Sequence, residues 1–281
     1  MRTIHSDAIV SAVAEICQEA AFRLPADVRR ALEEARGTEK SPLGLSILGQ
    51  ITENADLAER ERVPMCQDTG VAVYFVELGN EVRIEGLGLA EALAEGTRQG
   101  YTEGYLRMSI VKDPLFERVN TKTNGPPVVH VELVPGDRLR ITLAPKGGGS
   151  ENMSAMAMLK PLVGKEGVAE FVVETVRRAG GNACPPIIVG LGLGGNFERA
   201  PYLAKKALLR KLGSVHPDPR YAAFERELLE RVNATGVGPQ GLGGRTTALA
   251  VHIEAAPCHI ASLPVAVNLN CHAARHASVE L

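Results

Sequence analysis

The sequence predicts an α+β fold in which helices surround mixed β-sheets. Apolar residues recur with a helical period through the first sixty positions, whereas alternating, strand-like segments begin at Val71 and are then interspersed with further helices. Hydrophobic residues make up 45% of the 281 residues and charged residues 23%, a balance that excludes extended disorder. With no repeat and no linker, we expect one domain over 1–281, with a helical layer at 1–62 and an α/β core at 63–281.

Three helices are predicted in the first sixty residues. Ser6 is expected to cap the first helix, whose apolar stripe runs over 9–21. The second helix is expected over 25–37, and the third carries the apolar positions of 45–51. Their apolar faces predict that they pack as a layer.

After Val71 the spacing of apolar residues predicts strands and helices in alternation. The strands are expected at 71–77, 81–85, 128–134, 139–144, 187–190, 246–255 and 264–269. The helices are expected at 89–102, 152–162, 168–178, 197–212 and 219–233. The turn sequence Pro135-Gly136-Asp137 predicts that the strands on either side of it form a hairpin.

Charge and composition exclude two classes of partner. The net charge is −2, so no excess of positive charge is available to bind a phosphate backbone, and there is no Trp to stack on bases. The N-terminus lacks the pattern of a signal peptide, and no apolar run reaches the roughly 18 residues that a membrane span needs. We expect a cytoplasmic chain that binds neither nucleic acid nor membranes.

Cysteine usage directs attention to metal or catalytic chemistry. There are five cysteines, an odd count, and cytoplasmic thiols stay reduced. Cys17 lies on the apolar stripe of the first helix and is expected in the core. The other four lie in loops or at strand ends, at positions 66, 184, 258 and 271.

Two polar loops adjoin predicted strands. Met65–Gly70 places a thiol, an amide and a carboxylate on successive residues, which suits metal binding and proton transfer, although a buried Cys beside a turn gives the same pattern. Lys146–Asn152 contains three consecutive glycines between a strand and a helix. Backbone N–H groups there could hold an anion, or the segment could be a flexible connector with Ser150 as its cap.

The segment Gly190–Gly195 matches the G-x-G-x-x-G pattern of dinucleotide-binding loops. A nicotinamide-dependent dehydrogenase is therefore one alternative function. The surrounding βαβ unit is missing, however, because two helices follow and no second parallel strand ends in an acidic residue. The alternative consequently depends on this one loop.

The C-terminal part contains two adjacent Cys–His pairs, Cys258-His259 and Cys271-His272. Their spacing does not match that of a structural zinc site. Four other histidines have ordinary structural interpretations, as core or sheet residues at 130 and 252 and as surface or loop residues at 5 and 216.

Taken together, these segments resemble the class I iron–sulfur hydro-lyases, which are the fumarases and the L-tartrate dehydratases. Five stretches match in order and span most of the chain. They are Cys66–Gly70, Leu106-Arg107 to Asn124, Lys146–Asn152, Cys184-Pro185-Pro186 with the glycine run, and His259–Ser262 through Asn270–His276.

The resemblance implies a [4Fe–4S] cluster held by Cys66, Cys184 and Cys271 in the core at 63–281. Three thiolates on four irons leave one iron open to act as a Lewis acid. Cys258 departs from the family pattern, which more often has a hydroxyl residue there, and it is the main rival ligand.

The resemblance also implies a substrate site. Gln67, Asp68, Arg107, Gly148 and His259 are expected to contact a small dicarboxylate. Asp68 with His259 would form the general-acid pair, and Arg107 would bind a carboxylate.

Single-chain relatives continue into a second domain, whereas this sequence ends five residues after His276. It therefore resembles the α subunit of the two-subunit form, which would be active only with a separate β subunit, in an α2β2 heterotetramer. Reversible hydration of fumarate to L-malate is the expected reaction, and dehydration of L(+)-tartrate to oxaloacetate is the alternative.

Overall fold

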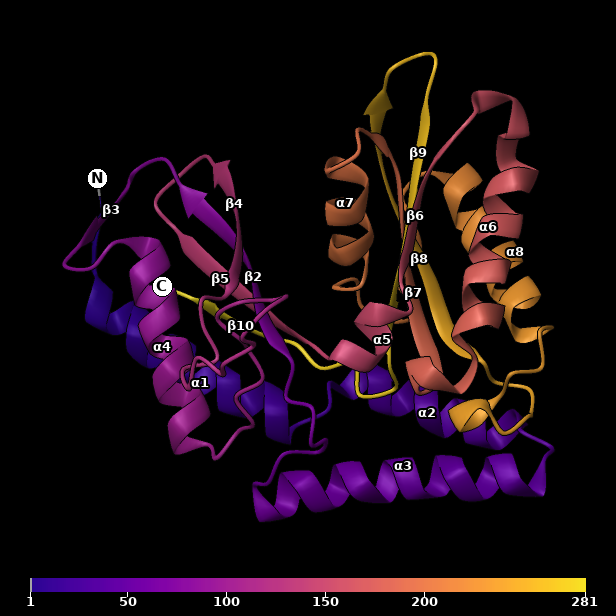
Figure 1. Ribbon diagram of the computed structural model, residues 1–281, viewed down its shortest axis with the longest axis horizontal. Helices are drawn as coiled ribbons and strands as arrows, with labels where there is room; N and C mark the ends of the chain where they lie inside the picture. Colours follow the sequence, from indigo (N-terminus) through magenta and orange to yellow (C-terminus); the bar gives the residue numbers. More distant parts are fainter. Residues whose placement is uncertain (1) are drawn as a thin grey trace. The chain divides into compact units, whose positions relative to one another are not determined.

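The computed structural model describes residues 2–281, which divide into two compact units (Figure 1). Unit 1 comprises the described residues up to Leu24, together with Ala55–Gly148 and Arg275–Leu281. Unit 2 comprises Pro25–Asn54 and Gly149–Ala274. Each unit contains helices and a mixed sheet, which confirms the predicted α+β class.

Unit 1 is built on a four-stranded sheet of order β10-β5-β2-β4. Its strands are β2 (Val71–Gly79), β4 (Val128–Val134), β5 (Leu139–Lys146) and β10 (Ala277–Glu280). Two helices, α1 (Ser6–Phe22) and α4 (Leu89–Glu103), pack on one another and on this sheet (Figure 1). A short parallel pair, β1 (Arg2–His5) and β3 (Val82–Glu85), completes the unit.

The hairpin predicted around Pro135–Asp137 is wrong. β4 and β5 do not pair with each other, because β2 lies between them, parallel to β4 and antiparallel to β5. β2 is buried on both faces, through Tyr74 and Val76 on one side and Val73 on the other, and such a strand belongs in the middle of a sheet. The turn instead bonds to the end of β2, where Gly136 N donates to Asn80 Oδ1 at 3.0 Å.

The cap predicted for the first helix is also different. His5 is the residue that caps α1, because its ring Nδ1 accepts a hydrogen bond from Asp7 N. Ser6 is already helical and buried, and its hydroxyl accepts from Leu87 N at 3.0 Å. The serine therefore connects α1 to the segment before α4.

Unit 2 is a three-layer arrangement around a sheet of order β6-β9-β7-β8. Its strands are β6 (Ala155–Leu159), β7 (Ile187–Gly195), β8 (Ala248–Cys258) and β9 (Leu263–Asn270). One face is covered by α7 (Arg199–Ala207), and the other by α6 (Gly164–Ala179) and α8 (Pro219–Asn233) (Figure 1). The remaining helices are α2 (Ala26–Thr38), α3 (Pro42–Glu61), the short α5 (Gly148–Asn152), and the 3-10 turns Pro161–Val163, Gly180–Ala183 and Pro239–Gly241.

The glycine-rich segment lies inside β7 and is not a phosphate-binding loop. A Cβ on Gly190 or Gly192 would overlap the backbone carbonyls of Ala204 and Ala200 on α7. These glycines therefore allow the helix to approach the strand closely. The dinucleotide interpretation is wrong, and the dehydrogenase alternative loses the motif on which it depended.

The helix predicted over 152–162 is wrong as well. Residues Ala155–Leu159 form the edge strand β6, antiparallel to β9, although Ala, Met and Leu favour helices. Pairing with β9 overrides that propensity. Among residues 2–281, no helix is both long and apolar enough to cross a membrane.

Candidate active site

The Cys66–Gly70 loop of unit 1 holds a carboxylate in a fixed orientation. Asp68 Oδ1 accepts a hydrogen bond from Gly70 N at 3.0 Å, and Oδ2 accepts one from Gly148 N at 2.7 Å. A Cβ on Gly147 would lie 3.2 Å from Oδ2, a tight contact that the carboxylate would have to shift to relieve. The glycine segment predicted as an anion cradle thus presents its amide to Asp68.

Side chains from elsewhere in unit 1 hold the backbone of this loop. The buried Tyr101 donates its hydroxyl hydrogen to the carbonyls of Thr69 and Gly70, at 2.9 and 3.1 Å, and Asn124 Nδ2 donates to Gly70 O at 3.1 Å. Thr69 Oγ1 donates to Arg107 O at 2.7 Å. Burial raises the pKa of Tyr101, which keeps the phenol protonated as a donor.

Four of the five predicted substrate residues therefore lie in one loop system of unit 1. Asp68 bonds Gly148 directly, and Gln67 is its neighbour, with Oε1 accepting from Cys66 Sγ at 3.5 Å. The backbone of Arg107 is tied to the same loop through Thr69, and the Arg107 side chain is exposed.

A buried arginine also contacts the loop, and sequence reasoning assigned it no role. Arg275 is 4% exposed, and its Nη2 donates to the backbone carbonyl of Asp68 at 2.5 Å. Arg275 and Tyr101 are 207 and 32 residues away from their partners in the loop. No local pattern in the sequence could have predicted either contact.

In unit 2, Cys184 lies immediately before β7 in the left-handed backbone conformation, with φ of 53°. Its carbonyl accepts from His272 N at 3.2 Å and lies 3.0 Å from His272 Nδ1. Gln240 supports the same place, because its backbone and side-chain N–H groups both donate to Pro185 O, at 2.8 and 3.0 Å. The segments that carry Cys184 and Cys271 are thus hydrogen-bonded to each other.

The sheet of unit 2 places His259 far from these two cysteines. Cys184 precedes β7 and Cys271 follows β9, and Ile188 at the start of β7 pairs with Asn270. The parallel strand β8 ends beside the other end of β7, where Gly195 pairs with Cys258. Since β7 has nine residues, the two ends are roughly 30 Å apart. Cys258 and His259 therefore lie at one end of the strands of this sheet, and Cys184 and Cys271 lie at the other end.

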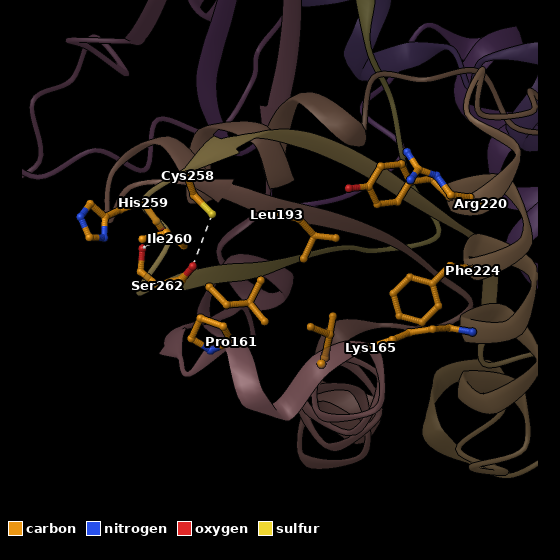
Figure 2. A pocket seen from close by; sticks show the side chains of 13 residues that line it. Pro161, Lys165, Leu193, Arg220, Phe224, Cys258, His259, Ile260 and Ser262 are labelled. Carbon is orange, nitrogen blue, oxygen red and sulfur yellow. Dashed lines mark hydrogen bonds between the residues drawn. The ribbon is translucent and has the colours of Figure 1, made fainter.

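An apolar pocket of about 650 Å³ lies at the C-terminal ends of β7 and β8. Leu193, Tyr221 and Phe224 line it, and Figure 2 shows His259 pointing away from Leu193 and Phe224. The thiol of Cys258 donates to Ser262 O at 3.3 Å. The pocket thus adjoins the β8–β9 loop and not the two cysteines at the start of β7.

The donor set fits an iron–sulfur group. Cys66, Cys184 and Cys271 are half-buried thiols in ordered loops, and thiolates are the ligands that such clusters take. In neither unit do the described residues gather three His, Cys, Asp or Glu side chains around one point. Cys66 belongs to unit 1, whereas Cys184 and Cys271 belong to unit 2.

The remaining candidates have structural roles. Cys17 is in the core of unit 1, and burial raises its pKa to about 12. His252 is buried in β8, where burial lowers its pKa to about 4. His130 on β4 packs its ring against Phe75, with the centroids 5.1 Å apart. These findings agree with the core and sheet roles expected from sequence.

Comparison with known proteins decides the family. The family model described as Fumarate hydratase (Fumerase) matches residues 10–280. The chain belongs to this fumarate hydratase family.

Named relatives of this fumarate hydratase family member are similar over nearly their whole length. A Methanocaldococcus jannaschii protein with the provisional name L(+)-tartrate dehydratase subunit alpha is 47% identical over 275 residues, covering 96% of both chains. The L(+)-tartrate dehydratase subunit alpha of Escherichia coli UTI89 is 36% identical over 263 residues, covering 92% of this chain and 86% of the relative. The K12 protein of the same name is 36% identical over 261 residues, covering 92% of this chain and 85% of its own.

Replacing Tyr101 should loosen the Cys66–Gly70 loop. We expect Tyr101→Phe to cost about 1–3 kcal/mol of unfolding free energy and to speed amide hydrogen exchange in residues 66–70, because the Thr69 carbonyl loses its donor. Tyr74→Phe is the matched control, since this equally buried hydroxyl contacts Thr97 and Cys17 and not the loop. Equal exchange rates in the two variants would contradict the role given to Tyr101.

Proposed function

We propose that this chain is the α subunit of an iron–sulfur-dependent hydro-lyase that acts on a small 2-hydroxy dicarboxylate. The observation that carries the proposal is the Asp68 carboxylate, held by two backbone amides two residues after Cys66. A proton donor or acceptor placed beside a metal ligand suits the removal of water across a carbon–carbon bond. Membership in the fumarate hydratase family supports the same chemistry.

Fumarate and L-malate are the first substrate pair, which agrees with the family's description. L(+)-tartrate is the second candidate, and the names of relatives 36–47% identical to this chain favour it. Malate and tartrate differ by one hydroxyl group, so both substrates are compared below.

Cys66, Cys184 and Cys271 would hold a [4Fe–4S] cluster. When bound, such a cluster offers an iron without a protein ligand, which polarises a substrate hydroxyl and carboxylate. Chain connectivity supports the ligand set. The residue after Cys271 is His272, whose backbone N–H bonds Cys184 O. Arg275, four residues after Cys271, bonds the carbonyl of Asp68.

The chain's own residues would bind and orient the substrate. Asp68 would exchange a proton with the departing hydroxyl, and its bonds to Gly70 and Gly148 keep the carboxylate from rotating. The exposed Arg107 would bind a carboxylate through its planar guanidinium, and Gln67 would contribute a polar contact.

His259 would have to reach the site from a second copy of the chain. Within one chain the β7 register holds it roughly 30 Å from the cysteines at the other end of the sheet. An α2β2 assembly contains a second copy. The exposed β8–β9 loop, with Ile260 at 92% exposure, could insert into that neighbour.

A β subunit is proposed to supply the rest of the site. The relatives above are named alpha subunits, which implies that those proteins have a partner. The base that removes the carbon-bound proton would come from that β subunit, together with further cationic groups for the second carboxylate.

The proposed reaction is tested by anaerobic cluster reconstitution of this chain with and without its β subunit. We expect turnover of malate or L(+)-tartrate only by the two-subunit complex, because the β subunit is proposed to supply the base. The higher kcat/KM of the two identifies the substrate. Appreciable turnover by the chain alone would remove the need for the partner, and inactivity of the loaded complex on both acids would refute the proposal.

The ligand assignment is tested by cysteine-to-serine variants of the reconstituted protein. We expect Cys66→Ser, Cys184→Ser and Cys271→Ser to lose the visible absorption of the cluster, because each removes one of three thiolates. Cys258→Ser should keep the absorption, since Cys258 lies at the other end of the unit 2 strands from Cys184 and Cys271. Cluster loss in Cys258→Ser with retention in Cys271→Ser would reverse the assignment.

The origin of His259 is tested by co-expressing His259→Ala and Cys184→Ser chains with different tags. Each variant alone should be inactive. In mixed oligomers, one site combines an intact cluster with the other chain's His259, so about half of the wild-type activity should return. The control pair Asp68→Asn with Cys184→Ser should stay inactive, because each residue is proposed to act in the site of its own chain. Both sites of the mixed oligomer then carry one defect. Mixed His259 oligomers as inactive as their parents would exclude a histidine supplied by the neighbour.

A further inference from the structure

Arg275 is a buried cation that forms no ion pair with any acidic side chain of residues 2–281. Its side chain is 4% exposed. Nη2 donates to the backbone carbonyl of Asp68 at 2.5 Å, whereas Nε is buried without a hydrogen-bond acceptor. The carboxylate of Asp68 accepts from the amides of Gly70 and Gly148, and Arg275 bonds only the backbone carbonyl of this residue.

This arrangement is unfavourable for the chain alone. A guanidinium stays protonated at any physiological pH, and a buried charge is destabilising unless a counter-charge compensates it. One peptide carbonyl offers only a partial negative charge. By contrast, the half-buried Arg210 of unit 2 is paired with the Glu225 carboxylate at 2.5 Å.

We propose that Arg275 binds an anionic group from outside the chain, next to the Cys66–Asp68 loop. The inference rests on the proposed function, which brings two such anions to this loop: the thiolate-bound cluster and a carboxylate of the substrate. Both provide the same chemistry, a negative charge that accepts the remaining N–H groups of a guanidinium. Arg275 thereby couples the position of Asp68, through its carbonyl, to the presence of that anion.

A merely structural role makes a different prediction. If Arg275 only fixed the Asp68 carbonyl, a neutral donor of similar length would serve as well, and anions would bind equally to both proteins. Arg275→Gln keeps amide donors and removes the charge, whereas Arg275→Lys keeps the charge with a different geometry. Arg140→Gln is the matched control, because it removes the charge of an exposed arginine on β5 of the same unit.

The experiment uses succinate, a dicarboxylate that has no hydroxyl to eliminate, and measures its binding by calorimetry to the α–β complex with and without cluster. If the anion is the substrate carboxylate, Arg275→Gln should weaken succinate binding at least tenfold in both forms, and Arg275→Lys should recover part of the loss. If the anion is the cluster, succinate binding to loaded protein should be unchanged. In the presence of a chelator, Arg275→Gln should then lose the visible absorption of the cluster several-fold faster than wild type. Arg275→Lys should lose it more slowly than Arg275→Gln.

Succinate affinity and cluster retention in Arg275→Gln that match those of Arg140→Gln would overturn the proposal. If Arg275→Gln fails to fold, Arg275→Lys decides alone, because a geometric change at a true anion contact still alters one of the two readouts. The comparison without cluster separates this test from the proposed function. A wild-type complex that binds succinate through Arg275 but turns over neither malate nor tartrate refutes the reaction and keeps the anion site.

Discussion

The hydrogen bonds that Asp68 accepts from Gly70 and Gly148 are the constraint on which the proposed site depends. They use both carboxylate oxygens, so the side chain cannot turn, and they join the loop before β2 to the segment after β5. The antiparallel pairing of β2 with β5 makes this possible, because Val71 lies opposite Lys146 in the register. The sheet of unit 1 thus determines where the carboxylate lies, and the loop residues only complete its contacts.

A different constraint governs unit 2. β8 runs parallel to β7 and β9 runs antiparallel to it. The end of β9, which precedes Cys271, therefore lies beside the start of β7, whereas the end of β8, which precedes His259, lies beside the end of β7. Glycines at 190 and 192 let α7 pack directly on this strand. The role proposed for His259 near these two cysteines therefore requires a second copy of the chain.

Sequence periodicity predicted most helices and strands, because it reports which face of a local segment is buried. It did not predict which strands become neighbours. Both β4–β5 and β8–β9 are consecutive in the chain, and each pair is separated by an earlier strand. The candidate cysteine ligands and substrate residues were predicted through family resemblance, and not from periodicity. Tyr101 and Arg275 carried no signal, since their loop contacts depend on tertiary structure that no short motif encodes.

The backbone at Cys184 shows why such a site needs the folded chain. A left-handed conformation costs a non-glycine residue roughly 1–2 kcal/mol, so the unfolded chain seldom adopts it. In unit 2, the bonds from His272 to Cys184 O, and from Gln240 to Pro185 O, stabilise it. These bonds join segments far apart in sequence. Pairing of β7 with β9 thus brings the segments that carry Cys184 and Cys271 next to one another, although 87 residues separate the two cysteines in the sequence.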